Sequence, residues 1–75
     1  MVHREEIGKN LRELRFRRGL NQIELAAASG VGQDTISLLE AGKHDPRPST
    51  LRKLASGLNA EIEELLYGPK VYAPS

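Results

Sequence analysis

The sequence contains no cysteine, so disulfide bonds and thiolate metal sites are excluded. Its two histidines, His3 and His44, lie far apart, and a metal site built on them would need carboxylates to complete it. We therefore expect no metal and no cofactor. No apolar run approaches the roughly 20 residues of a membrane span, and residues 1–4 lack the apolar core of a signal peptide. These absences predict a cytoplasmic protein.

Net charge is also small, at +1, but it is unevenly distributed. The first twenty residues carry six Lys or Arg against three Glu, whereas residues 61–75 carry one Lys against three Glu. This asymmetry is compatible with one phosphate-facing side, and equally with ordinary solvated faces. With 75 residues, the chain is near the lower size limit for a single hydrophobic core.

Helical periodicity begins in the first segment. Ile7, Leu11 and Leu14 follow one another at steps of four and three, which predicts an amphipathic helix over Glu5–Arg18. Gly19 is placed to end it.

The aromatic residue of this segment, Phe16, lies off the apolar stripe. Together with Tyr67, Val71 and Tyr72 it belongs either to a satellite cluster or to a dimer surface. Of the two, we expect Phe16 to be part of the core.

A pair of short helices follows. Asn21 is a good N-cap for a helix over Gln22–Ala28, whose buried face contains either Ile23 or Leu25, together with Ala26. Ala26 is small, as the close crossing of two helices at a tight turn requires.

A tight turn at 29–31 leads to the next helix, because Gly30 can adopt the left-handed conformation that redirects the chain. Val31 then packs inward, and the third helix spans Gln33–Leu39 with Ile36 and Leu39 on its inner face. Four residues remain on its outer face: Gln33, Asp34, Ser37 and Leu38.

The remaining sequence predicts two further helices. Pro48 suits the first turn of the fourth, and Gly57 within it is a weak point that costs about 1 kcal/mol relative to alanine. Asn59 is expected to be left-handed, and Glu61–Tyr67 forms a fifth helix with Ile62, Leu65 and Leu66 inward. Because no segment alternates with period two, the fold class is all-α. We expect one domain over residues 1–68 and a short tail over 69–75.

The residues Gly19-Leu20-Asn21-Gln22, Glu24-Leu25-Ala26, Gly30, Ile36, Leu39, Glu40 and Gly42 form a pattern that resembles a known family. This family is the Cro/repressor-type (xenobiotic-response-element) class of helix-turn-helix transcription regulators. The resemblance runs from Ile7 to Gly68. It implies a compact five-helix bundle of the phage-repressor type, in which the second and third helices form the helix-turn-helix.

The resemblance also implies DNA contacts, with the third helix in the major groove. Gln33 can make a bidentate contact to adenine, whereas Asp34 can accept from a cytosine amine or, alternatively, stabilise its own helix N-terminus. Ser37 can bond to a base or a phosphate. Leu38 departs from the polar or basic residue common in the family, and could touch a thymine methyl or a protein partner. Phosphate contacts are expected from Asn21, Gln22, Arg15, Lys43, His44 and Arg47.

Two further roles come from the family pattern. Arg15 and Glu40 occupy positions that form an ion pair between the first helix and the end of the recognition helix. The dimer surface is expected at Asn59, Ile62, Leu66 and Tyr67.

These expectations converge on a repressor-like regulator that binds a pseudo-palindromic operator on double-stranded DNA as a homodimer, and that is nucleoid-associated when bound. The alternative is a protein-interaction module of the same fold, such as an antitoxin or adaptor, with exposed Leu38 in its favour. An enzyme is not expected, because His44, Asp45 and Ser49 are scattered loop residues without a pocket around them.

Overall fold

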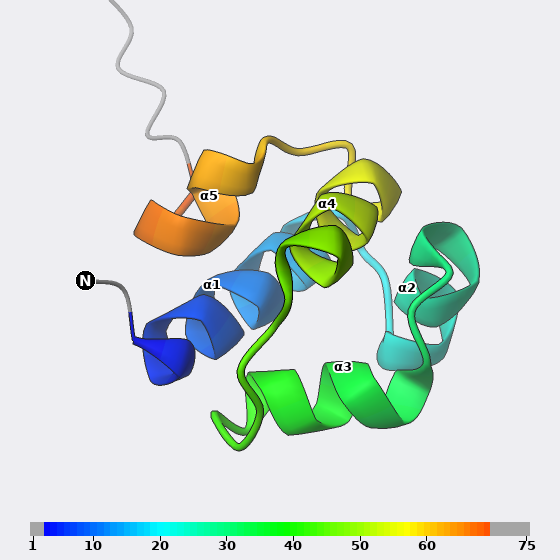
Figure 1. Cartoon of the computed structure of the whole chain (residues 1–75). Helices are drawn as coiled ribbons and strands as arrows, with labels where there is room; N and C mark the ends of the chain where they lie inside the picture. Colours follow the sequence, from blue (N-terminus) through cyan, green and yellow to red (C-terminus); the bar gives the residue numbers. More distant parts are fainter. Residues whose placement is uncertain (1–2, 70–75) are drawn as a thin grey trace, which may run out of the picture.

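The computed structural model describes residues 3–69, and within that range the chain forms five helices and no strand (Figure 1). This confirms the all-α prediction, and the bounds agree with the expected ones to within a residue. The predicted roles of Val71 and Tyr72 lie outside the described residues. The helices are α1 Arg4–Arg17, α2 Gln22–Ser29, α3 Gln33–Glu40, α4 Pro48–Gly57 and α5 Ile62–Tyr67.

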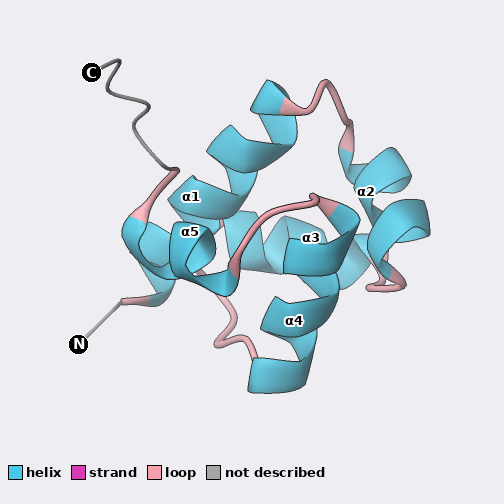
Figure 2. Cartoon of the chain, turned by 90° about the horizontal axis from the view of Figure 1, so that it is seen from above, coloured by secondary structure: helices cyan, strands magenta, loops and turns pink. Residues whose placement is uncertain are grey.

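Helix α1 is the central element of the arrangement, because it packs against both α3 and α5. Helix α2 packs against α3 and α4, and α4 packs against α5. Two perpendicular views place α2 and α5 on opposite sides of the molecule (Figures 1 and 2). Helix α3 lies along one edge of the bundle, at the bottom of Figure 1. None of the helices between residues 3 and 69 combines the length and apolar character needed to cross a membrane.

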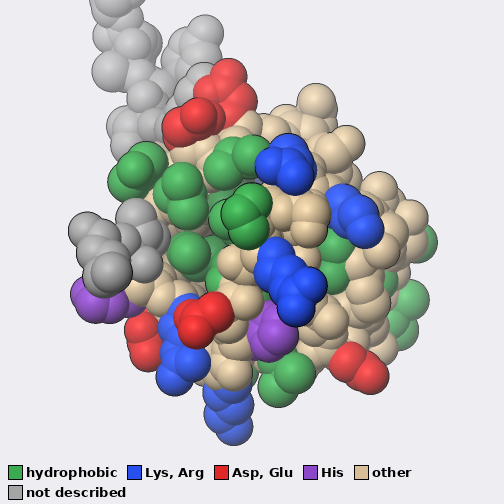
Figure 3. Space-filling model, viewed as in Figure 1, with side chains coloured by type: hydrophobic (Ala, Val, Ile, Leu, Met, Phe, Trp, Pro, Cys, Tyr) green, Lys and Arg blue, Asp and Glu red, His purple; other side chains and the backbone are tan. Residues whose placement is uncertain are grey.

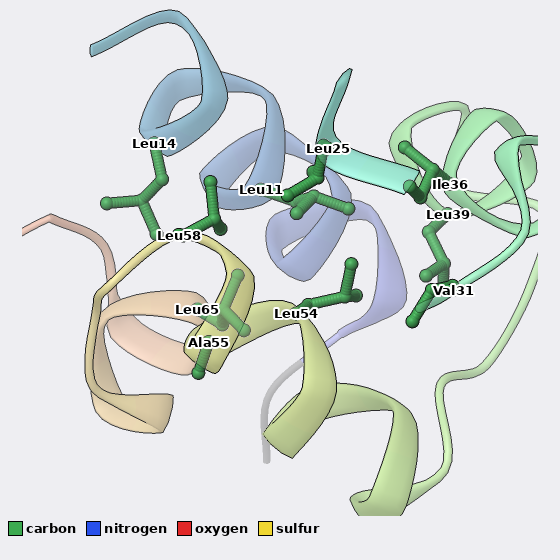
Figure 4. Packing of buried hydrophobic residues seen from close by; sticks show 10 residues of the cluster. All are labelled: Leu11, Leu14, Leu25, Val31, Ile36, Leu39, Leu54, Ala55, Leu58 and Leu65. Carbon is green, nitrogen blue, oxygen red and sulfur yellow. The ribbon is translucent and has the colours of Figure 1, made fainter. Parts of the chain in front are cut away.

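One hydrophobic core joins all five helices (Figure 4). It resolves the alternative left open for α2, because Leu25 is fully buried whereas Ile23 is 65% exposed. On α5 only Leu65 is buried; Ile62 and Leu66 are half-buried instead of fully inward. The core consists of Leu11, Leu14, Leu25, Val31, Ile36, Leu39, Leu54, Ala55, Leu58 and Leu65.

The ends of α2 are fixed by local interactions that the sequence predicts. Asn21 Oδ1 accepts a hydrogen bond from the Glu24 amide at 2.7 Å, and Glu24 Oε1 accepts one from the Asn21 amide at 2.9 Å. This reciprocal capping box satisfies two amides at the start of the helix. At the other end Gly30 adopts φ +76°, the left-handed conformation expected at the turn.

Two side chains, one in α1 and one just after it, bond carbonyl groups near the ends of distant helices. Asn10 Nδ2 donates to the Leu65 carbonyl of α5 at 2.8 Å. Arg18, just after α1, donates through Nε to the Leu58 carbonyl at 2.7 Å, at the C-terminal end of α4. Asn59 follows there with φ +51°, the predicted left-handed conformation. A cation at a helix C-terminus satisfies free carbonyls and matches the helix dipole.

Two glycines inside helices mark the closest approaches in the bundle. A Cβ on Gly8 would overlap the Leu39 carbonyl oxygen, where α1 crosses α3. A Cβ on Gly57 would lie 2.7 Å from the Ser29 Cβ, where α4 meets the end of α2. The prediction that Gly57 is simply a weak point is therefore wrong, because the crossing requires the missing side chain. Ala26, which we assigned to the close crossing of α2 and α3, is partly buried and packs against the core.

Replacing Gly57 with alanine separates the two explanations. Helix propensity alone would stabilise the protein by about 1 kcal/mol, whereas the clash with Ser29 should destabilise it by about 1–3 kcal/mol. We expect destabilisation, measured as the free energy of unfolding in urea. Ser56→Ala, at the neighbouring exposed position of α4, is the control, because it changes propensity without a new contact. A Gly57→Ala variant as stable as the parent chain would contradict the packing explanation.

Candidate nucleic-acid interface

The helix-turn-helix consists of α2, the turn after Ser29, and α3. The turn is tightened by a hydrogen bond from the Val31 amide to Ser29 Oγ at 3.2 Å, and Val31 is buried as predicted. The inner face of α3 is held by Ile36 and Leu39, whose side chains are 0% and 1% exposed. One side of α3 is therefore fixed in the core and the other faces solvent.

The structure brings the four predicted base-reading residues together on that outer side of α3. Gln33, Asp34, Ser37 and Leu38 are all exposed, and their spacing places them on one face of the helix. Leu38 remains 45% exposed, which is considerable for a large apolar residue. The outer face presents amide, carboxylate, hydroxyl and apolar groups, and no cation.

Candidate phosphate contacts come from segments that precede and follow α3 in the chain. Asn21 and Gln22 begin α2, whereas Lys43 and His44 lie exposed in the loop after α3. Arg47 is exposed just before α4. In Figure 3, Lys and Arg side chains are spread from the upper right to the lower left of the viewed face, with Asp and Glu side chains among those of the lower part. The Asn21 oxygen is already used in the capping box, which leaves its amide group available to an anion.

Arg15 and Glu40 form the ion pair that the family pattern implies, and it is nearly closed to solvent. Arg15 Nε lies 2.7 Å from Glu40 Oε2, and Arg15 Nη2 lies 2.9 Å from Oε1. The two side chains are 9% and 6% exposed. Such bidentate, charge-assisted pairs are the strongest hydrogen bonds that side chains make in proteins.

Two more groups complete this network. Arg15 Nη1 donates to the Leu20 carbonyl at 2.9 Å, and Gln22 Nε2 donates to Glu40 Oε1 at 3.2 Å. The amide of Gln22, predicted to hold a phosphate, is therefore also bonded inside the protein. Because Arg15 donates through all three nitrogens to protein acceptors, its phosphate contact remains a prediction. The network connects α1, the chain before α2, α2 itself and α3.

The hydrogen bonding that Arg15 donates to the Glu40 carboxylate raises the pKa of Arg15 above its ordinary value, against the opposing effect of burial. A raised pKa means that the stabilisation is present at all lower pH values and is lost only as pH rises through the folded-state value. Because arginine already titrates at very high pH, Arg15 remains charged under all ordinary conditions. The arginine side of the pair therefore adds no pH dependence near neutrality.

The predicted dimer residues lie on α5 and the preceding corner. Tyr67 is 75% exposed, Asn59 is exposed, and Ile62 and Leu66 are half-buried. Hydrophobic side chains gather on the face that includes α5 in Figure 3. These residues form one exposed, partly apolar surface, on the side of the molecule away from α2.

Several placements differ from the sequence expectations or were missed. Phe16, predicted to be part of the core, is 59% exposed, because it points from the side of α1 opposite Leu11 and Leu14. The contacts of Asn10 and Arg18 were not predicted, since their partners lie far away in sequence. A glycine inside a helical pattern was the one signal that could have identified the close approach at Gly8.

Comparison with known proteins agrees with the helix-turn-helix described above. The helix-turn-helix family model matches residues 11–65. The HTH-type transcriptional repressor RghR of Bacillus subtilis is 44% identical over 64 residues, which are 84% of this chain and 47% of that protein. The HTH-type regulator y4dJ of Sinorhizobium fredii is 40% identical over 66 residues, 88% of this chain and 86% of that protein. This chain thus spans less than half the length of RghR and of its B. subtilis relative RghRB, of which it covers 43%.

Solved structures show the same fold. The restriction-modification controller protein C.AhdI of Aeromonas hydrophila superimposes with a TM-score of 0.80 at 35% identity, covering 83% of this chain and 94% of that one. The clp gene regulator ClgR of C. glutamicum gives a TM-score of 0.80 at 32% identity, covering 87% and 84%. These relatives are named as regulators and not as enzymes. Because the family model covers most of the chain and the helices agree with it, the chain belongs to the Cro/repressor-type helix-turn-helix family.

Proposed function

We propose that the protein is a sequence-specific regulator of transcription that binds double-stranded DNA and acts as a repressor. The observation that carries this proposal is the exposed outer face of α3, displayed by a helix whose inner face is fully buried. A helix held in this way fits the major groove, about 12 Å wide, with its N-terminal residues against base edges. The names of the relatives point to the same function.

The base-reading residues define the chemistry of the half-site. Gln33, in the first turn of α3, suits a bidentate contact to adenine. Asp34 suits the amine of a cytosine and opposes phosphates, while Leu38 suits the methyl group of a thymine. Ser37 can form a hydrogen bond with either a base or a phosphate. The half-site should therefore be read by a few directional contacts and by apolar contact with thymine.

Backbone contacts would set the position of α3 without reading sequence. Asn21 and Gln22 would hold one phosphate at the start of α2, where free amides and the helix dipole favour an anion. Lys43 and His44 would hold another beyond the end of α3, with Arg47 close by in sequence. Arg15 would add to these only through an N–H not used by Glu40 or Leu20.

A homodimer would double this interface. The surface formed by Asn59, Ile62, Leu66 and Tyr67 is exposed, partly apolar and separate from α3, so pairing through it leaves both recognition helices free. Two half-sites about 34–36 Å apart would then be read on one side of the duplex. A pseudo-palindromic operator follows from the two-fold symmetry of such a dimer.

A second function is favoured by one observation, the 45% exposure of Leu38 on the outer face of α3. An apolar residue there suits a protein partner as well as it suits a thymine methyl. On this alternative the protein is an antitoxin or adaptor, and α3 is covered by another polypeptide.

Selection of bound duplexes from random-sequence DNA separates the two functions. We expect the purified protein to enrich a two-fold symmetric motif at low salt, with affinity falling steeply as salt rises because several phosphates are contacted. Sequencing the bound fraction over successive rounds measures this. Recovery of no motif at low salt would overturn the DNA-binding proposal and leave the protein-partner alternative.

Gln33→Ala and Lys43→Ala should weaken binding in different ways. Loss of the Gln33 amide should cost about 1–3 kcal/mol on the operator and relax specificity at one base pair. Loss of the Lys43 charge should weaken binding to all sequences alike and reduce the salt slope by about one unit. Titrations of the operator and of single-base variants at several salt concentrations test both. If Gln33→Ala weakened all sequences equally, Gln33 would not be a base-reading residue.

The role of the ion pair in aiming α3 requires a variant that remains folded. Arg15→Met alone should destabilise the protein by about 3–5 kcal/mol, because it leaves the Glu40 carboxylate buried and unpaired. Arg15→Met combined with Glu40→Leu should recover most of that stability. We expect this double variant to bind the operator about tenfold more weakly, a change of about 1.4 kcal/mol. Binding as tight as that of the parent chain would show that the pair does not orient α3.

A further inference from the structure

Phe16 is the one phenylalanine in the chain, and it lies on the solvent side of α1 without a place in the core. Its ring nevertheless has specific neighbours. The Arg15 guanidinium carbon lies 4.7 Å from the ring centroid, and that of Arg12 lies 5.3 Å away. Both distances are within the roughly 6 Å at which a cation is attracted to an aromatic face.

The position of the ring matters because the Arg15 guanidinium makes its hydrogen bonds in its own plane. A guanidinium is planar, with its N–H donors in the plane and none on the faces. Arg15 uses donors on every nitrogen, two of them toward Glu40 and one toward the Leu20 carbonyl. The faces of the group carry no donor, so they can be covered only by a contact of another kind. The phenylalanine ring supplies a neighbour of suitable chemistry.

The group contacted in this way sets the geometry of the whole helix-turn-helix. Glu40 at the end of α3 accepts from Arg15 and also from Gln22 of α2. Rotation of the guanidinium plane would break the bidentate contact and loosen α3 relative to α1. A ring packed against the guanidinium opposes that rotation and keeps water from part of it, which strengthens the interaction between the charges.

We infer that Phe16 is a positioning residue for the recognition helix. Its ring stacks on Arg15 and holds the guanidinium in the orientation that makes both hydrogen bonds to Glu40. Arg12, one turn earlier on the same helix, packs against the ring and helps to keep it there. The inference rests on the proposed DNA-binding function only for its effect on affinity; its effect on the ion pair can be measured without DNA.

A double-mutant cycle tests the contact directly. Phe16→Leu should shift the unfolding equilibrium toward the unfolded state by about 2- to 5-fold, the strength expected of a partly exposed cation–π contact. Leucine is the better helix former, so a loss cannot come from propensity. In the Arg15→Met, Glu40→Leu background the same substitution should have a smaller effect, because only the Arg12 contact with the ring remains. An equal loss in both backgrounds would overturn the inference.

A spectroscopic measurement covers the case in which the background variant folds poorly. The Arg15 Nε–H resonance should be shifted by the aromatic ring and protected from exchange with water in the parent chain. Phe16→Leu should remove the shift and speed the exchange, while Phe16→Trp should keep both. Ile23→Ala, which removes another exposed apolar side chain, is the matched control and should leave the resonance unchanged. An Arg15 resonance unaffected by Phe16→Leu would contradict the stacking role.

Affinity for the selected operator completes the test. Phe16→Leu should weaken binding by about 2- to 5-fold, the same factor as in the unfolding equilibrium, with no change in the salt slope because no phosphate contact is lost. Phe16→Trp should restore the affinity. A reduced salt slope would show instead that Phe16 supports a phosphate-contacting cation such as Arg12. If no operator is selected, the proposed function fails while the cycle and the resonance still decide the inference.

Discussion

The closed ion pair between Arg15 and Glu40 is the interaction on which the displayed helix depends. Taking two charges out of water is unfavourable unless their geometry and hydrogen bonding are nearly complete. Here both requirements are satisfied by groups from separate elements. The Leu20 carbonyl accepts a hydrogen bond from Arg15, and the Gln22 side-chain amide donates one to Glu40. The pair therefore forms properly only when α1, α2 and α3 are all in place. Under the role proposed for it, an interaction that contributes little net stability specifies a single arrangement.

Backbone proximity makes that geometry possible. At Gly8 the backbone of α1 lies against the end of α3, directly beside Leu39 and Glu40, and Gly57 allows the same closeness between α4 and the end of α2. Interiors are packed densely enough that one added methyl group displaces neighbouring elements. The glycines thus allow the short distances between these helices, while the charged network bonds α3 to α1 and α2. On the proposed role of the ion pair, both are needed to hold α3 in one orientation.

The sequence predicted the helices well because their signals are local. The apolar period of Leu11 and Leu14, the cap at Asn21 and the turn at Gly30 all act within a few residues of themselves. The exposed face of α3 follows from the same period. Phe16 and Gly57 were predicted wrongly because their roles depend on partners that only the tertiary arrangement brings near. The ion pair was found through family resemblance, since nothing in residues 15 and 40 alone pairs them.

The hydrogen bonds that Asn10 and Arg18 make with distant helix ends have a consequence for the order in which contacts form. Asn10 bonds a carbonyl that lies 55 residues later in the chain, and the carbonyl that Arg18 bonds lies 40 residues later. Such separations must close against chain entropy before the contacts return any stability. During synthesis these two hydrogen bonds can therefore form only after residues 58 and 65 have been added to the chain.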